Sequence, residues 1–164
     1  MGEAAAGIIA DLTRRGLTIA IAESLTGGLV VAELVSVPGA SKVVNGGVVA
    51  YNTALKRSLL GVDDRLLADR GAVDPDVAAA MAEGVRRVCA IDGQPASIGL
   101  STTGVAGPDP QDGKPVGTVF VGVSTDAGTR VFDLTLGGSR NALRRRVVSE
   151  SLVQLKKVLT GLDT

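Results

Sequence analysis

The spacing of apolar residues changes several times along the first part of the chain. Apolar residues recur at helical spacing over residues 3–15, and Gly16 ends that pattern. The short apolar run at residues 18–22 predicts a strand. A second helix is expected after Gly28 and is ended by Pro38. The chain therefore opens with a helix, a strand and a second helix.

The middle of the chain continues this alternation. Residues 43–51 are typical of a strand, which Gly46-Gly47 interrupts, and residues 53–60 of a short helix. Asp74-Pro75 predicts a helix start, because Asp is a favoured N-cap and Pro suits the first helical turn. The expected buried positions of this helix are Val77, Met81, Val85 and Val88.

The second half of the chain alternates apolar with small residues, which is typical of strands. Three such strands are expected, at residues 96–102, 116–125 and 129–136. Gly128 marks the hairpin between the last two, and a final helix is expected from near Ser139 towards Leu159.

These elements predict the fold class. The chain has 164 residues and is 45% hydrophobic, which suits one domain with a sizeable core, so a single domain is expected over residues 1–164. Helical crossovers combined with a hairpin indicate a three-layer α/β/α domain with a mixed, mostly parallel sheet. We expect parallel pairing at the crossovers and antiparallel pairing at the hairpin.

Charge and aromatic content exclude several classes of binding protein. Lys and Arg number 17, as do Asp and Glu, so no net charge attracts nucleic acid or an anionic membrane. The aromatic residues Tyr51, Phe120 and Phe132 are too few for a base-stacking platform. We therefore expect neither a nucleic-acid nor a membrane partner.

The absence of histidine restricts the chemistry. It removes Ser-His-Asp triads, Cys-His dyads and the commonest zinc ligand, and neither a metal nor a cofactor is expected. We interpret Cys89, the single cysteine, as a core residue, and the lack of an internal disulfide fits a reducing compartment. No run reaches the ~18 apolar residues of a membrane span, and the start lacks signal-peptide features. A cytoplasmic protein is expected.

Two loops rich in glycine and hydroxyl groups follow predicted strands, where ligands gather in open α/β sheets. Residues 22–28 (Ala-Glu-Ser-Leu-Thr-Gly-Gly) let the backbone approach a ligand, although a plain helix N-cap is the alternative. Residues 101–108 (Ser-Thr-Thr-Gly-Val-Ala-Gly-Pro) lead into residues 108–115, typical of a mobile, solvated loop or lid. Neither loop has the spacing of a Walker A or dinucleotide-binding fingerprint.

A third candidate region, residues 46–56, contains Tyr51 and Lys56. Without histidine, a lysine is the natural base for a serine, provided that its pKa falls from ~10.4 towards 7 through desolvation or a nearby cation. A solvated surface lysine is the alternative.

Basic residues gather in the last helix. Residues 138–157 contain one acid, Glu150, and six basic residues, namely Arg140, Arg144, Arg145, Arg146, Lys156 and Lys157. Cations are disfavoured at a helix start, so an anion is expected there. Arg140 and Arg144 share a face at i and i+4 and together suit a phosphate or carboxylate. Pairing with the acids of residues 63–83 is the alternative.

Together, these segments resemble the CinA C-terminal domain family over nearly the whole chain. The matching segments, in the family's order and spacing, are residues 22–28, 46–56, 103–108 and 114–119 (Lys-Pro-Val-Gly-Thr-Val). The resemblance implies an amidohydrolase that converts nicotinamide mononucleotide to nicotinate mononucleotide and ammonia in the pyridine nucleotide cycle. Longer CinA proteins carry an additional N-terminal domain linked to ADP-ribose pyrophosphatase activity.

The resemblance also implies roles for particular residues. The expected catalytic residues are Ser24 as nucleophile, Lys56 as neutral base and Thr103, whose hydroxyl holds the oxyanion together with the backbone amides of residues 26–28. The expected substrate-binding residues are Thr26, Gly27, Gly28, Tyr51, Gly104, Arg140 and Arg144. Arg140, aided by Arg144, is expected to hold the phosphate, and Tyr51 to stack on or orient the pyridine ring. The sequence departs from the family's commoner residues at Asn52-Thr53 and Asp74.

Two alternatives to this reaction stay open. One is a non-catalytic nucleotide-binding or protein-interaction module of the competence/damage-inducible type. The other is hydrolysis of a different small amide. The expected partners are a small-molecule nucleotide and a second copy of the chain in a homo-oligomer, since Gly46-Gly47 lies in a possible edge strand and family members self-associate.

Overall fold

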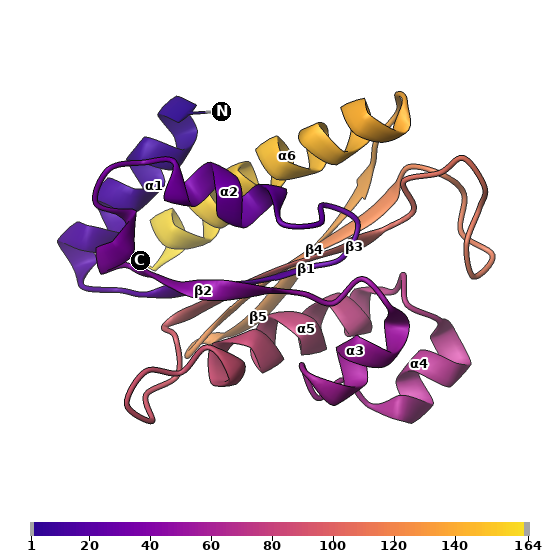
Figure 1. Cartoon of the computed structure of the whole chain (residues 1–164), viewed down its shortest axis with the longest axis horizontal. Helices are drawn as coiled ribbons and strands as arrows, with labels where there is room; N and C mark the ends of the chain where they lie inside the picture. The colour runs from indigo at the N-terminus through magenta and orange to yellow at the C-terminus, as the bar shows by residue number, and fades with distance from the viewer. Residues whose placement is uncertain (1, 163–164) are drawn as a thin grey trace.

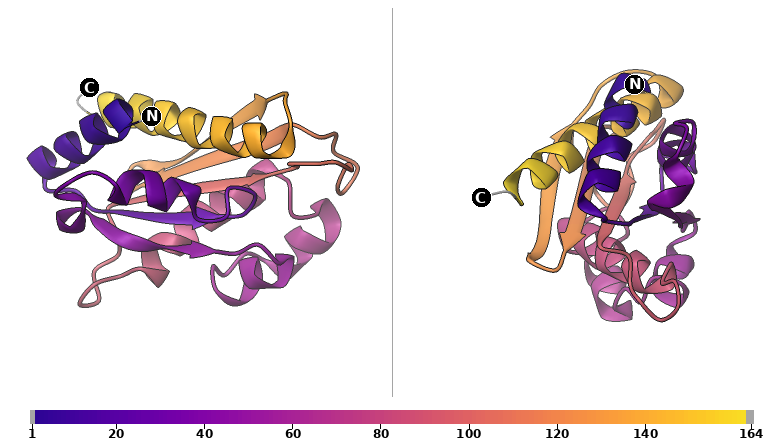
Figure 2. Two further views of the ribbon diagram at one scale, coloured as in Figure 1. Left: turned by 45° about the horizontal axis from the view of Figure 1, so that its top comes forward. Right: turned by 90° about the vertical axis from the view of Figure 1, so that its left-hand side faces the viewer.

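A five-stranded sheet lies between two layers of helices in the computed structural model, which describes residues 2–162 (Figures 1 and 2). The strands are β1 (Ile19–Glu23), β2 (Val44–Val49), β3 (Ile98–Gly104), β4 (Thr118–Thr125) and β5 (Gly128–Thr135). One layer holds α1 (Gly2–Arg15), α2 (Leu29–Val35) and α6 (Arg140–Gly161). The other layer holds α3 (Thr53–Ser58), α4 (Asp64–Arg70) and α5 (Pro75–Val88).

The sheet order is β2-β1-β3-β4-β5. β1 pairs in parallel with β2 and β3, whereas β4 runs antiparallel to both β3 and β5. The predicted three-layer α/β fold with a mixed sheet is therefore confirmed, and β2 is an edge strand as expected. Because β1, β2 and β3 run in the same direction, the loops that follow them lie together at the carboxyl ends of these strands.

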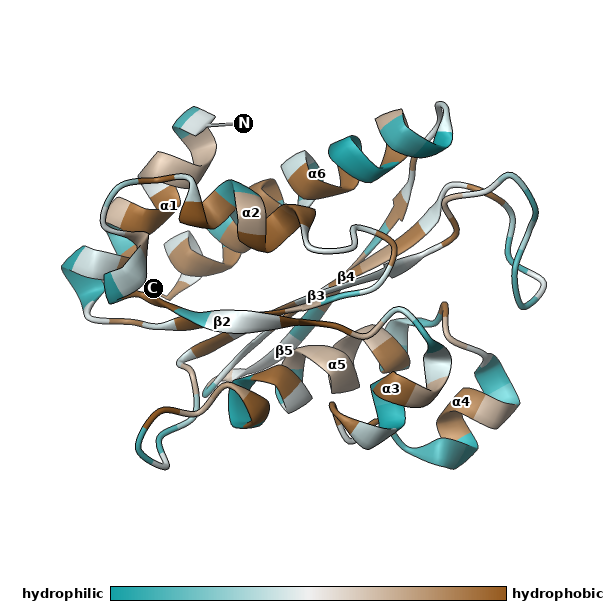
Figure 3. Ribbon diagram, in the orientation of Figure 1, coloured by the Kyte–Doolittle hydropathy of each residue, from teal (hydrophilic) through white to brown (hydrophobic). Residues whose placement is uncertain are grey.

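Each face of the sheet is covered by the apolar side of its helices. Ile8 and Leu12 of α1 and Leu143 of α6 are fully buried in one core, and Val77 and Met81 of α5 in another. Close packing requires glycine at Gly84, where an added Cβ would lie 1.9 Å from the Leu60 carbonyl oxygen. Hydrophilic residues concentrate instead near the start of α6 and in the loop from β3 to β4 (Figure 3).

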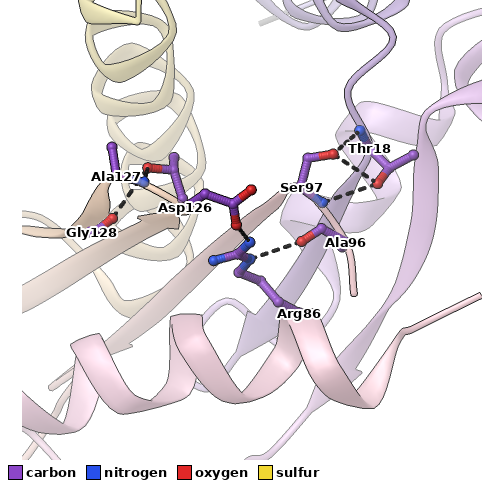
Figure 4. A network of polar contacts seen from close by, with 8 residues as sticks. Thr18, Arg86, Ala96, Ser97, Asp126, Ala127 and Gly128 are labelled. Atoms are coloured by element: carbon purple, nitrogen blue, oxygen red, sulfur yellow. Dashed lines mark hydrogen bonds and ion pairs between the residues drawn. The ribbon is translucent and has the colours of Figure 1, made fainter. Parts of the chain in front are cut away.

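A polar network lies at the opposite end of the sheet, where β1 and β3 begin (Figure 4). Arg86 of α5 donates a 2.8 Å hydrogen bond to the Ala96 carbonyl and forms an ion pair with Asp126. The Thr18 amide donates to Ser97 Oγ over 3.1 Å. These contacts join α5, the β4–β5 turn and the starts of β1 and β3. The loops at the carboxyl ends of β1, β2 and β3 take no part in this network.

Most predicted elements are present. Asp74 caps α5 as expected, because its side chain accepts a 2.9 Å hydrogen bond from the Asp76 amide. α4 was not predicted: it spans seven residues and buries none of them fully, so it lacks a clear apolar stripe. The short 3₁₀ helix Ala40–Lys42 was also missed.

Cys89 follows α5 and is partly buried against the second core, and this burial raises the pKa of its thiol. None of the described helices combines the length and apolar character needed to cross a bilayer. Residues 1, 163 and 164 of the expected domain lie outside the described residues.

Candidate active site

A cavity of about 160 Å³ opens where the loops after β1, β2 and β3 meet. Of the predicted site residues, it is lined by Ser24, Tyr51, Lys56, Thr103, Gly104 and Arg140. The other lining residues are Leu25, Ala72, Val73, Val105, Ala106, Gly107, Asp109 and Gln111. The fold thus gathers six of the ten predicted residues from four separate segments.

Lys56 and Ser24 are in direct contact at the floor of this cavity. Lys56 Nζ lies 2.9 Å from Ser24 Oγ and donates a 2.8 Å hydrogen bond to the Ala50 carbonyl. Lys56 is fully buried, which is unusual for lysine. Its position follows from the start of α3 directly after β2, where Asn52 caps the helix by accepting from the Ala54 amide.

Burial changes the protonation of Lys56. Loss of hydration lowers the pKa of this amine to about 8. No ion pair to Lys56 occurs among residues 2–162, so no carboxylate opposes this shift. A neutral amine has two N–H donors and one lone pair; with one N–H on the Ala50 carbonyl, its lone pair can face Ser24 Oγ. The arrangement suits proton transfer from serine to lysine.

Thr103 lines the cavity, but its hydroxyl is engaged. Thr103 Oγ1 donates a 2.7 Å hydrogen bond to the Ala72 carbonyl. The single hydrogen of this hydroxyl is already used, so the expected donation to an oxyanion would require the bond to Ala72 to break. The hydroxyl remains able to accept a hydrogen bond from a ligand in the cavity.

The turn after β1 also differs from expectation, since Thr26, Gly27 and Gly28 do not line the cavity. The Gly27 amide donates to the Ser24 carbonyl over 3.1 Å, and the Gly28 amide donates to the Glu23 carboxylate over 2.9 Å. Both amides are used in hydrogen bonds within residues 23–28, so they are not available to an oxyanion in this conformation. The Leu25 amide has no hydrogen-bond partner in the described part of the chain, and Leu25 lines the cavity.

Arg140 and Tyr51 lie together at the cavity. Arg140 donates a 2.8 Å hydrogen bond to the Tyr51 hydroxyl and a further hydrogen bond to the Gly107 carbonyl. Tyr51 is 59% exposed. The guanidinium at the start of α6 therefore joins the loops after β2 and β3 and adds a positive charge to the cavity that Ser24 and Lys56 also line.

Arg144 does not join Arg140. It is partly buried, donates to the carbonyls of Leu25 (2.8 Å) and Thr26 (3.0 Å), and does not line the cavity. This position does not support the expected contact of Arg144 with the substrate. The alternative, pairing with the acids of residues 63–83, is not found for either arginine within residues 2–162.

Glu23 is a functional candidate that the sequence analysis missed. It is fully buried, directly precedes Ser24, and its carboxylate accepts three backbone N–H groups of the following turn and helix. The available signal was the N-cap of α2: Gly28 has no side chain to cap the helix, and Glu23 is the nearest acid that precedes it in the chain.

Comparison with protein families gives a match over almost the whole chain. The family described as "CinA C-terminal domain" matches residues 2–159. A "putative competence-damage inducible protein" of a Geobacillus strain is 51% identical over 93% of this chain and 36% of its own length. A "CinA-like protein" of Frankia casuarinae is 46% identical over 94% of this chain and 35% of its own. The chain thus spans about a third of these curated relatives.

Solved structures show the same fold at full length. A competence/damage inducible protein from Agrobacterium tumefaciens matches with a TM-score of 0.88 and 34% identity, covering 97% of this chain and 94% of that one. A competence-damaged protein (CinA) superfamily member from Klebsiella pneumoniae matches with a TM-score of 0.91 and 26% identity, covering 98% of each chain.

Proposed function

This chain belongs to the CinA C-terminal domain family, and from that premise we propose that it hydrolyses the carboxamide of nicotinamide mononucleotide to nicotinate mononucleotide and ammonia. The observation that carries the proposal is the buried Lys56 amine 2.9 Å from Ser24 Oγ, in a cavity that Arg140 also lines. The names of the relatives refer only to competence and damage induction, so the reaction rests on this chemistry and on the family resemblance.

The proposed reaction begins with Ser24. Its Oγ forms a bond to the carboxamide carbon while its proton passes to neutral Lys56. Collapse of the tetrahedral intermediate breaks the C–N bond, and the Lys56 ammonium returns the proton to the leaving nitrogen as ammonia departs. Water then attacks the Ser24 ester while Lys56 accepts a proton from it, and Lys56 passes this proton to Ser24 Oγ as the ester bond breaks and the carboxylic acid leaves.

Charge develops on the carboxamide oxygen during the attack. We assign the donor for this oxygen to the Leu25 amide, because it makes no hydrogen bond within residues 2–162, belongs to a residue that lines the cavity and directly follows the nucleophile. One such donor typically lowers the barrier by ~2.7 to 4 kcal/mol.

The remaining cavity residues select the substrate. A volume of about 160 Å³ suits an aromatic carboxamide, and its opening at Arg140 leaves the phosphate near a guanidinium. Tyr51 is held by Arg140 and orients the pyridine ring, and Gly104 of β3 lines the cavity beside Thr103. The proposal needs no metal and no cofactor.

The same proposal includes a cytoplasmic location and self-association as a homodimer. The exposed edge strand β2 supports the latter, because an unpaired strand edge is a ready surface for a second copy.

The alternative function is a non-catalytic nucleotide-binding or protein-interaction module, which needs the cavity and Arg140 but no neutral Lys56. Incubating the purified protein with nicotinamide mononucleotide and measuring ammonia separates the two, with Ser24→Ala and Lys56→Ala as controls. Binding of the mononucleotide without ammonia release would favour the module. Release from another amide in a substrate panel, but not from the mononucleotide, would change the assigned substrate.

A further inference from the structure

The turn that carries Ser24 is held by two charged side chains that lie outside the cavity. One is Glu23, whose carboxylate accepts from the amides of Gly28 (2.9 Å), Val30 (3.1 Å) and Val31 (2.9 Å). Glu23 is fully buried, and these amides stabilise its charge at the start of α2. The carboxylate therefore fixes the far end of the turn to the end of β1.

The other is Arg144, which reaches the turn from α6. Its Nε donates to the Leu25 carbonyl (2.8 Å) and its Nη2 to the Thr26 carbonyl (3.0 Å), so one planar guanidinium holds two consecutive peptide groups. The guanidinium also packs close to Gly27: a Cβ added there would lie 3.1 Å from Arg144 Nη2.

Backbone and hydroxyl contacts complete the attachment to the sheet. The Ser24 amide donates to the Thr102 carbonyl over 3.1 Å, and the hydroxyls of Thr26 and Thr102 lie 2.7 Å apart. β3 thus holds one side of the turn and α6 the other. Ser24, whose Oγ lies 2.9 Å from Lys56 Nζ, directly precedes this turn, and Leu25, which lines the cavity, is its first residue.

We propose that Arg144 and Glu23 are positioning residues, which hold the Leu25–Gly28 turn so that Ser24 Oγ faces Lys56 Nζ and the Leu25 amide faces the cavity. Arg144 acts through the backbone and does not contact the substrate. This inference rests on the proposed amidase function of Ser24. A misplacement of about 1 Å in a reacting group can cost about 100-fold in rate, so loss of the contacts should reduce turnover rather than substrate affinity.

The kinetic test compares Arg144→Gln with Arg145→Gln. Arg145 is the next residue of α6, is exposed, and its side chain makes no hydrogen bond or ion pair within residues 2–162. Arg144→Gln should lower kcat about 10- to 100-fold with KM for nicotinamide mononucleotide nearly unchanged, and Arg144→Lys, which keeps one donor group, should recover part of the loss. Arg145→Gln should match the wild type. A raised KM with normal kcat in Arg144→Gln would overturn the inference and make Arg144 a substrate ligand.

A second test needs no enzymatic activity. Hydrogen exchange should be faster over residues 25–31 in Arg144→Gln than in the wild type and in Arg145→Gln, with the rest of the chain unchanged. Glu23→Gln should accelerate exchange at the Gly28, Val30 and Val31 amides. Unchanged exchange in Arg144→Gln would overturn the inference. If the wild type released no ammonia, the proposed function would fail, while this measurement would still decide whether Arg144 holds the turn.

Discussion

Lys56 Nζ and Ser24 Oγ lie 2.9 Å apart although the two residues are separated by 32 positions in the chain. The parallel pairing of β1 with β2 brings them together, because Ser24 follows the end of β1 and α3 begins soon after β2. The contact therefore depends on the register of two strands and on the start of one short helix. It supplies a base for a serine in a chain without histidine.

Activity should depend on the protonation of Lys56. Because only the neutral amine accepts the serine proton, kcat/KM should rise about tenfold per pH unit up to about pH 8, where the Lys56 pKa lies, and level off above it. Steady-state kinetics from pH 6 to 9.5 would measure this profile. Equal kcat/KM values at pH 6 and pH 8 would mean that Lys56 is not the base.

The lowered pKa of Lys56 also predicts a pH dependence of stability. Between pH 8 and the ordinary lysine pKa of 10.5, the unfolded chain holds a proton on Lys56 that the folded chain has lost, so the free energy of unfolding rises with pH. The full gain across this window is about 3 kcal/mol, absent below pH 8 and complete above pH 10.5.

Denaturant unfolding of wild type and Lys56→Met across this pH range tests the effect. The stability of the wild type relative to Lys56→Met should increase with pH, because the variant cannot titrate there. Exposed Lys42 offers a matched control, and Lys42→Met should run parallel to the wild type. A constant difference between wild type and Lys56→Met would show that the buried amine keeps an ordinary pKa.

Arg140 should act in substrate binding rather than in the chemical step. Arg140→Ala should raise KM for nicotinamide mononucleotide about 10- to 100-fold with kcat little changed, because a phosphate contact persists through the reaction. Tyr51→Phe, which removes only the 2.8 Å hydrogen bond to Arg140, should raise KM less. A large loss of kcat at unchanged KM in Arg140→Ala would contradict this assignment.

Close packing of α5 should make Gly84 intolerant of a side chain. Gly84→Ala should destabilise the protein by about 1 to 3 kcal/mol, since the new Cβ would meet the Leu60 carbonyl oxygen at 1.9 Å unless the backbone shifts. Gly7→Ala in α1 is the matched control: its Cβ meets nothing within 4 Å, and it should stabilise by roughly 0.5 to 1 kcal/mol. Equal midpoints of thermal unfolding in the two variants would refute the packing argument.

Local pattern predicted most elements of this fold. Asp74-Pro75 correctly indicated the start of α5, because capping depends only on neighbouring residues. α4 was missed because none of its residues is fully buried, so its sequence carries little helical periodicity. The pairing of β1 with both β2 and β3 was open, since strand order depends on contacts between distant segments.

In the candidate site too, the sequence indicated the residue types but not the contacts that they make. The segments that carry Ser24, Lys56 and Thr103 were identified from their residue types, and these three residues line one cavity. Arg140 and Arg144 looked equivalent because they are one helical turn apart, yet one donates to Tyr51 and the other to the Ser24 turn. Only tertiary structure separates a side chain that faces a cavity from one that holds the backbone beside it.

Ammonia release from nicotinamide mononucleotide, measured for the wild type and Ser24→Ala, tests the proposed function most directly. We expect steady release by the wild type and a loss of at least about 1000-fold in kcat for Ser24→Ala, whose folding should be unchanged because, within residues 2–162, the Ser24 side chain forms a hydrogen bond only with Lys56. Equal release by the two proteins, or none by the folded wild type, would contradict the account.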